Sequence, residues 1–184
     1  MADINSEPIG GVGPALRNAD ERPLTDRDAR LITVVELIFF AYRDFTREAD
    51  AVLAEFGLGR AHHRVLHFVS RNPGLRVADL LDILKITKQS LARVLKELLD
   101  EGWIAQQTGK LDRRERLLRV TDRGAALAAR LDQLQAKRVR GALSACGAES
   151  EALIRKFLFS MISLDERSSV EALLPEYAKN DTGR

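Results

Sequence analysis

Apolar residues recur at helical spacing along most of this chain, and glycine, proline and polar clusters separate the helical stretches. Residues 29–56 contain neither Gly nor Pro, and their apolar positions cover more than one face of a helix. Such a helix must be buried on several sides, which in a small protein predicts a helix shared between two subunits. Residues 1–28, interrupted by Gly and Pro, indicate a flexible tail.

Three shorter helices are predicted after this long one, over 60–71, over 77–84 and from Thr87 to about Glu101. The Asn72-Pro73-Gly74 turn ends the first of them, Thr87 is a candidate N-cap, and Gly102 is typical of a helix C-terminus. The positions expected to be buried are Ala61, Val65, Leu66, Phe68 and Val69, then Val77, Leu80, Leu81 and Leu84, then Leu91, Val94, Leu95 and Leu98.

The periodicity then changes to that of a β-hairpin. Residues 103–107 and 116–120 are the strand candidates, and the turn begins at Thr108-Gly109-Lys110. Thr121 is the N-cap candidate of a long helix over about 122–143. A further apolar helix is expected over 150–164 and a short one near 170–177. The predicted fold is therefore mainly α with a small β-hairpin.

A short helix, a tight turn, a second helix and a charged hairpin form the layout of a winged helix-turn-helix. In that arrangement the second helix enters the DNA major groove, and the hairpin, or wing, contacts the backbone or the minor groove. In the helix from Thr87, the face opposite the apolar stripe carries Gln89, Arg93 and Lys96, with Lys88 and Ser90 on either side. Gln can pair with adenine and Arg with guanine, and Thr87 with the helix N-terminus can hold a phosphate. The alternative is a merely solvated amphipathic helix.

The hairpin is rich in cations, which repel one another unless water, salt or a polyanion compensates. We expect Arg114 to insert into the minor groove and Lys110 and Arg113 to contact phosphates. Asp112 is expected to orient a neighbouring arginine. The distribution of charge along the chain agrees with a local polyanion site. Residues 60–123 hold 14 Lys and Arg against 8 Asp and Glu, whereas the remaining residues hold 15 Lys and Arg against 19 Asp and Glu.

Composition narrows the class of protein. With 45% hydrophobic and 30% charged residues the chain is a globular one, able to bury a core. Its single cysteine excludes an intrachain disulfide and favours a cytoplasmic location. The most apolar stretch, 31–42, contains Glu36 and is too short to cross a membrane. No nucleophile–base pair, phosphate-binding glycine loop or metal-ligand cluster has a usable spacing, so we expect no enzyme and no cofactor.

Residues 75–124 resemble the MarR-type winged-helix regulators. The ITKQSLARVLKELLDEGWI segment is similar to the family's recognition helix and following strand, and LDRRERLLRVTDRG is similar to its wing. The AHHRVLHFVSRNPG segment resembles one subgroup of the family. The resemblance, which extends over about residues 29–164, implies a homodimer joined through its N- and C-terminal helices. It also implies double-stranded DNA with a pseudo-palindromic operator as partner, and repression relieved in many members by a small ligand.

The resemblance divides the chain into an N-terminal tail over 1–28, an N-terminal dimerisation helix over 29–59, a DNA-binding lobe over 60–124, and C-terminal dimerisation helices with a tail over 125–184. Family ligand pockets lie between the dimerisation helices and this lobe. The residues expected near such a pocket are Tyr42, Phe45, His62, His63 and His67. Two readings stay open beside a ligand-controlled repressor: a protein-interaction module, and a metal-responsive regulator using His63 and His67, which are spaced i, i+4. Cys146 is interpreted as incidental.

Overall fold

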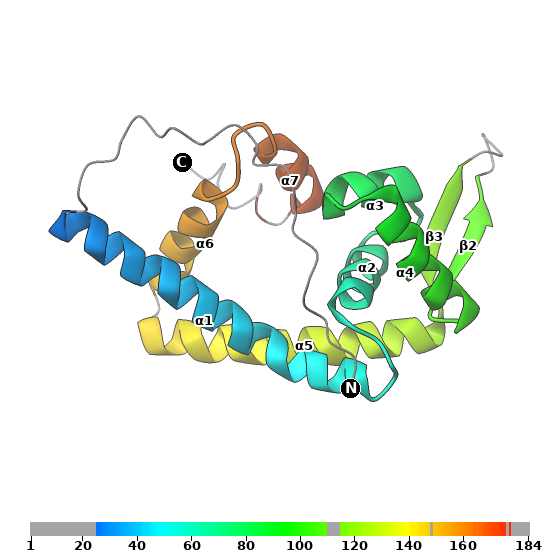
Figure 1. The fold of residues 1–184 in the computed structure, drawn as a ribbon, viewed down its shortest axis with the longest axis horizontal. Helices are drawn as coiled ribbons and strands as arrows, with labels where there is room; N and C mark the ends of the chain where they lie inside the picture. Colours follow the sequence, from blue (N-terminus) through cyan, green and yellow to red (C-terminus); the bar gives the residue numbers. More distant parts are fainter. Residues whose placement is uncertain (1–24, 110–114, 148, 176, 178–184) are drawn as a thin grey trace, which may run out of the picture. The chain divides into compact units, whose positions relative to one another are not determined.

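The computed structural model describes residues 25–109, 115–147, 149–175 and 177. Over these residues the chain forms seven helices and one three-stranded sheet (Figure 1). The elements are α1 (Asp26–Ala54), α2 (Arg60–Arg71), β1 (Leu75–Arg76), α3 (Val77–Leu84), α4 (Lys88–Asp100), β2 (Ile104–Thr108), β3 (Arg116–Val120), α5 (Asp122–Cys146), α6 (Ser150–Ser160) and α7 (Arg167–Leu173). A mainly helical fold with a small hairpin is therefore confirmed.

The chain divides into two compact units, residues 1–41 and 42–184, so α1 begins in the first unit and ends in the second. The helix begins at Asp26, three residues earlier than the sequence pattern predicts. Thr25 and Asp28 explain the difference, because each accepts a hydrogen bond from the other's backbone N–H, at 2.9 and 3.3 Å. The Thr25 N–H and the Thr25 hydroxyl both donate to the Asp28 carboxylate, and these two hydrogen bonds lower the pKa of Asp28.

The core of the second unit is built from the apolar stripes that the sequence predicts. The last turns of α1 contribute Ala49, Val52 and Leu53, and α5 contributes Leu127 and Leu131. Leu91, Val94, Leu95 and Leu98 of α4 are all buried, as expected. The prediction for α2 is wrong at Ala61, which is exposed. His63, which was not expected in the core, is buried. The buried residues of the remaining elements include Val65, Leu66, Val69, Leu80, Leu84, Trp103, Ile104 and Leu118.

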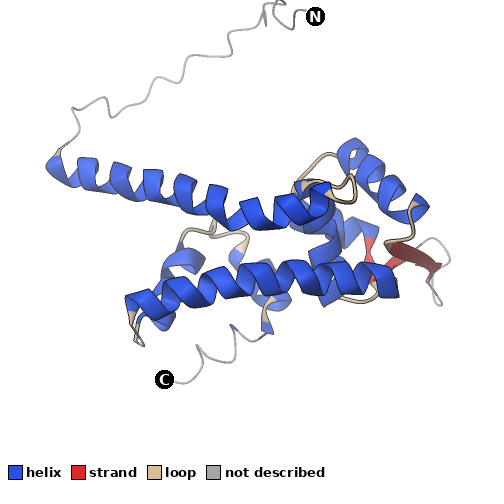
Figure 2. Ribbon diagram, turned by 90° about the horizontal axis from the view of Figure 1, so that it is seen from below, coloured by secondary structure: helices blue, strands red, loops and turns tan. Residues whose placement is uncertain are grey.

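The sheet has the order β1-β3-β2 and is antiparallel throughout. Its hairpin pairs Ile104 with Val120 at one end and Thr108 with Arg116 at the other. Figure 2 shows this sheet near the N-terminal end of α5, and helices form the rest of the second unit. The strand β1 was not predicted, because two residues are too short to show an alternating pattern.

Two predicted N-caps are confirmed. The Thr87 hydroxyl oxygen accepts a hydrogen bond from the Ser90 N–H, and the Thr121 hydroxyl oxygen accepts one from the Gly124 N–H, each at 3.1 Å. Gly102, at φ +71°, ends α4 in the left-handed region as expected. The C-terminal helices differ from their predicted bounds: α5 extends to Cys146, α6 ends at Ser160 and α7 spans 167–173.

The junction between β2, β3 and α5 is closely packed around Trp103, which is 1% exposed. The Thr121 N–H donates to the Trp103 carbonyl oxygen at 3.1 Å, and the Phe56 ring meets the indole edge-on at 5.2 Å between centroids. A Cβ atom added to Gly124 would lie 2.0 Å from the Trp103 carbonyl oxygen. Only glycine at position 124 therefore lets the first turn of α5 approach this strand so closely.

We expect Gly124→Ala to destabilise the protein by about 1–3 kcal/mol or more, because the backbone must move to relieve the contact. The matched control is Gly141→Ala, since a Cβ at this exposed position of α5 has no neighbour within 4 Å. That control should stabilise the helix by about 0.5–1 kcal/mol. Urea unfolding followed by circular dichroism measures both changes. Equal midpoints for Gly124→Ala and the parent would contradict the close approach.

Candidate nucleic-acid interface

The turn between α3 and α4 positions α4 relative to the rest of the second unit. Lys85 ends α3 in the left-handed conformation, at φ 51°. Two groups from other elements hold this turn: Arg64 of α2 donates to the Leu84 carbonyl oxygen at 3.2 Å, and Glu166 pairs with the Lys85 ammonium at 2.9 Å. The ion pair raises the pKa of Lys85. Side chains from two other parts of the fold thus hold the turn that leads into α4.

Helix α4 separates an apolar face from a polar one. Its four buried residues pack on the core, while the side chains at Gln89, Arg93 and Lys96 are exposed on the opposite side. Thr87 and Ser90 are exposed too, but their hydroxyl groups bond to one another at 2.9 Å as part of the N-cap. The structure thus places the predicted groups of α4 together, on the side that faces away from the core.

The cations on α4 differ in whether a carboxylate of the protein already pairs with them. Lys96 donates to Asp100 Oδ2 at 2.5 Å, and this hydrogen bond raises the pKa of Lys96. Within the part of the chain that the structure describes, Lys88 and Arg93 have no ion-pair or hydrogen-bond partner. Two cations without a partner among the described residues favour an anionic partner, and the helix dipole adds positive potential at Lys88, the first residue of α4.

The hairpin beside α4 is described up to its tip. Strands β2 and β3 pair over five residues each, and the Gly109 N–H donates to the Glu115 carbonyl oxygen at 3.1 Å where the strands end. Arg116 and Arg119 are exposed on β3, and Arg116 donates to the Thr108 hydroxyl at 3.2 Å. The predicted wing contacts Lys110, Arg113 and Arg114, and the orienting Asp112, lie outside the described residues. Their roles stay predictions.

An ionic cluster that includes Glu115, at the start of β3, was missed by the sequence reasoning. Arg76 donates to both carboxylate oxygens of Asp79, at 2.6 and 2.8 Å, and to Glu115 at 3.4 Å. The hydrogen bonds from Arg76 lower the pKa of Asp79, and these two carboxylates raise that of Arg76. The spacing of Arg76 and Asp79 is a detectable signal, but the partnership with Glu115 depends on strand pairing.

His62 and His67 have separate partners. The Gly59 N–H donates to His62 Nδ1 at 3.0 Å, so Nε2 of that ring carries the hydrogen facing Glu97 Oε2 at 2.6 Å. His67 pairs with Asp132 at 3.0 Å. His63 is 9% exposed, and burial, with His67 nearby, lowers its pKa. Among the described residues no group of three or more His, Cys, Asp or Glu is placed to hold a metal ion.

The predicted ligand pocket stays a prediction. Tyr42 is exposed, with the Arg60 guanidinium 5.8 Å from its ring centre, and Phe45 is half-buried. Two cavities of the second unit have other linings. One lies between α3, α4 and the hairpin, and the other, of about 300 Å³, is bordered by α6 and the chain around Leu174. None of the five residues expected near the pocket lines either cavity.

No described helix is both long and apolar enough to cross a membrane.

Comparison with known proteins agrees with this architecture. A MarR family model matches residues 56–115. The HTH-type transcriptional regulator PetP of Rhodobacter capsulatus is 44% identical over 135 residues, which cover 73% of this chain and 81% of PetP. The structure of Streptococcus pneumoniae FabT in complex with DNA aligns with a TM-score of 0.64 and 15% identity, over 71% of this chain and 94% of FabT.

A third similar structure is that of the Mycobacterium tuberculosis MarR family protein Rv2887 in complex with p-aminosalicylic acid. It has a TM-score of 0.51 and 25% identity, over 70% of this chain and 97% of Rv2887. The alignment with PetP covers more of the chain than the winged helix alone. It agrees with the resemblance of residues 61–74 to one subgroup of the family. These regulators are not enzymes. On its sequence and its fold, the chain belongs to the MarR family of transcriptional regulators.

Proposed function

We propose that this protein is a sequence-specific DNA-binding repressor that acts as a homodimer on a pseudo-palindromic operator. The observation that carries the proposal is the arrangement of α4, whose apolar stripe is buried while Gln89, Arg93 and Lys96 stay exposed beside a cationic hairpin. A helix of this kind fits the DNA major groove, where Arg and Gln side chains distinguish base pairs. The DNA complex of the similar FabT supports the same use of the fold.

Homodimerisation is supported by large apolar side chains that a single chain leaves exposed. In the first unit these include Leu37 and Phe39, which are 60% and 69% exposed. In the second unit, α6 and the residues after it expose Leu153, Leu158 and Leu164. Apolar surface of this extent is typical of an interface between subunits. A two-fold dimer would present two copies of α4 to half-sites about one helical turn apart.

Relief of repression by a small ligand completes the proposed function. The Rv2887 structure holds p-aminosalicylic acid, so a protein of this fold takes an organic acid. For this chain, an effector would act by binding the DNA-free form more tightly than the DNA-bound form, because only a difference in affinity shifts the equilibrium.

Arg93→Ala should weaken binding to operator DNA by about 1–3 kcal/mol and relax the base preference at one position of each half-site. The DNA is taken from upstream of the protein's own gene, and fluorescence anisotropy measures binding to it, to single-base variants and to scrambled DNA. Arg140→Ala is the control, since Arg140 is an exposed arginine of α5 outside the winged helix. An unchanged base preference in Arg93→Ala would contradict the role of Arg93.

Arg114→Ala should weaken binding to all DNA sequences and reduce the slope of log K against log salt by about 1, because it removes one cation from the proposed DNA interface. The same anisotropy assay, run at several salt concentrations, measures this slope, and Arg140→Ala again serves as the control. A variant that keeps the parent's affinity and slope would show that Arg114 does not approach the DNA.

Leu153→Asp should raise the dissociation constant of the dimer at least about ten-fold, because it places a charge in an apolar interface. Ala152→Asp is the matched control, one residue away on the exposed surface of α6. Sedimentation equilibrium measures both variants and the parent. If both substitutions leave the dimer equally intact, Leu153 lies outside the interface.

A further inference from the structure

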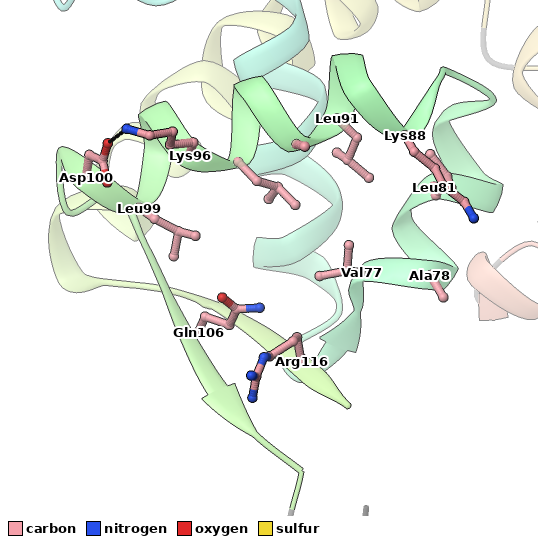
Figure 3. Close-up of a pocket in the computed structure, with 12 residues that line it drawn as sticks. Val77, Ala78, Leu81, Lys88, Leu91, Lys96, Leu99, Asp100, Gln106 and Arg116 are labelled. Atoms are coloured by element: carbon pink, nitrogen blue, oxygen red, sulfur yellow. Dashed lines mark hydrogen bonds and ion pairs between the residues drawn. The ribbon is translucent and has the colours of Figure 1, made fainter. Parts of the chain in front are cut away.

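The hairpin receives little support from α4 along most of its length. A cavity of about 580 Å³ with mostly apolar walls lies between α3, α4 and the hairpin. Figure 3 shows Leu91 and Leu99 of α4 on one side of this space and Gln106 and Arg116 of the hairpin strands on the other. Close packing joins α4 and the hairpin at the base of the hairpin, around Trp103. The outer part of the hairpin therefore depends on contacts at its other edge.

That other edge is paired with β1 over two residues, and the pair nearer the tip of the hairpin is Arg76 with Leu117. The Arg76 side chain continues the contact beyond this pair, because its Nη1 donates to the Glu115 carboxylate at 3.4 Å. The Glu115 carbonyl oxygen in turn accepts from the N–H of Gly109, which follows β2. The side chain of Arg76 thus reaches the hairpin at the start of β3, further out than the strand pairing does.

Asp79 orients the Arg76 guanidinium for this contact. Its two carboxylate oxygens accept from Nε and Nη2 of Arg76, at 2.8 and 2.6 Å, which leaves Nη1 directed at Glu115. A planar guanidinium can hold two carboxylates in such a fixed geometry, whereas a lysine ammonium is a point charge without a fork. Arg76, Asp79 and Glu115 therefore form a brace between the first turn of α3 and the start of β3, called the Arg76 brace below.

Arg76 is an unfavourable residue for the start of α3. It occupies the N-cap position, where Ser, Thr, Asp or Asn accepts a hydrogen bond from the helix backbone, and its side chain makes no such bond. A serine there would stand three residues before Asp79, which is the spacing of a capping box. At this position the chain forgoes a helix cap and gains a link to the hairpin. This exchange indicates a role for Arg76 other than stabilising α3.

We propose that Arg76 is a positioning residue for DNA binding, which acts through Glu115 to hold the hairpin in a fixed place relative to α3 and α4. The proposal rests on the proposed function, in which α4 and the hairpin contact the same DNA. Two carboxylates already occupy the Arg76 guanidinium, so it differs from a cation that is free to pair with phosphate. A hairpin without the brace loses more conformational freedom when it binds DNA, and this loss weakens binding.

The size of the effect follows from the exposure of the pair. The side chains of Arg76 and Glu115 are 52% and 35% exposed, so solvent and salt screen their attraction. The brace can order the hairpin only by as much as it contributes itself. Loss of an ion pair of this kind corresponds to a change of about two- to five-fold in DNA affinity.

The first experiment tests the brace without DNA. Arg76→Ser breaks the brace and supplies a favourable N-cap, so the variant should melt at no lower a temperature than the parent. NMR hydrogen exchange should nevertheless show faster exchange at the Gly109 N–H, which donates to Glu115. The Thr121 N–H, at the base of the hairpin, should keep its parent rate. Arg140→Ser, the control, removes the same charge from the exposed surface of α5 and should change neither amide.

Two results of this experiment would overturn the proposal. One is an unchanged exchange rate at Gly109 in Arg76→Ser. The other is an equal acceleration at Gly109 and Thr121, because that pattern indicates a general loss of stability and not a hairpin that has lost its brace.

A double-mutant cycle then tests whether Arg76 acts on DNA binding through Glu115. Fluorescence anisotropy measures binding to DNA from upstream of the protein's own gene. Arg76→Ser should weaken binding about two- to five-fold in the parent and clearly less in Glu115→Gln, where the link is already broken. Arg140→Ser should cost the same in both backgrounds. A direct contact between Arg76 and phosphate would make the loss from Arg76→Ser equal in both, and that result would refute the positioning role.

Arg76→Lys separates the geometry of the brace from its charge. Lysine keeps the positive charge but cannot hold Asp79 and Glu115 together, so it should recover little of the affinity lost in Arg76→Ser. Full recovery by lysine would show that charge alone matters and would contradict the brace.

The two kinds of measurement distinguish this proposal from the proposed function. If the hairpin of Arg76→Ser exchanges faster but the variant binds DNA as tightly as the parent, the positioning role is wrong and the proposed function stands. If the parent itself binds no DNA, the proposed function fails and the positioning role fails with it, while the exchange data still show whether the brace holds the hairpin.

Discussion

The contact between the first turn of α5 and the backbone of Trp103 is the constraint on which the DNA-binding lobe depends. Trp103 follows the left-handed Gly102, and its N–H donates to the Leu98 carbonyl oxygen at the end of α4. Its own carbonyl oxygen accepts from Thr121 and lies against Gly124. One residue thereby joins the recognition helix, both hairpin strands and the long helix α5. The angle between α4 and the hairpin is set at this point.

Several weaker interactions reinforce this junction. The Arg123 guanidinium stacks 3.7 Å from the indole centre and donates to the Glu101 carbonyl oxygen at 2.8 Å. The indole N–H donates to the Glu101 carboxylate at 2.9 Å. These contacts satisfy polar groups around a large buried ring, and unsatisfied groups of this kind are costly. A rigid junction matters for a DNA reader because base contacts require a helix held in fixed orientation.

On α4, the residues that stabilise the fold and the residues proposed to bind DNA lie on different faces. Stability of the lobe depends on the buried leucines and valine, so the exposed side chains are free to be chosen for binding. The flank occupied by Lys88 and Lys96 borders both the face proposed for DNA and the apolar cavity.

Local signals along the chain were enough to predict the helices, the hairpin and the polar face of α4. Thr87, Gly102 and Thr121 fix the ends of elements through their own backbone neighbours, and the buried positions of α4 follow from helical spacing. The family could also be recognised from the sequence, since the recognition helix and the hairpin carry a distinctive combination of residues. The start of α1 was misplaced by three residues because the Thr25–Asp28 pair lies in a segment poor in apolar residues.

Contacts between residues that are distant in the sequence depend on how the elements pack. Strand β1 exists because Leu75 pairs with Leu118, and the link from Arg76 to Glu115 follows from that pairing. Likewise His62 and His67, which share one helix and could have shared a ligand, face Glu97 and Asp132 on different elements. The cavity between α4 and the hairpin arises from the packing angle of three elements. Hydrophobic periodicity shows which face of a helix is apolar. It does not show where the packed elements leave a cavity between them.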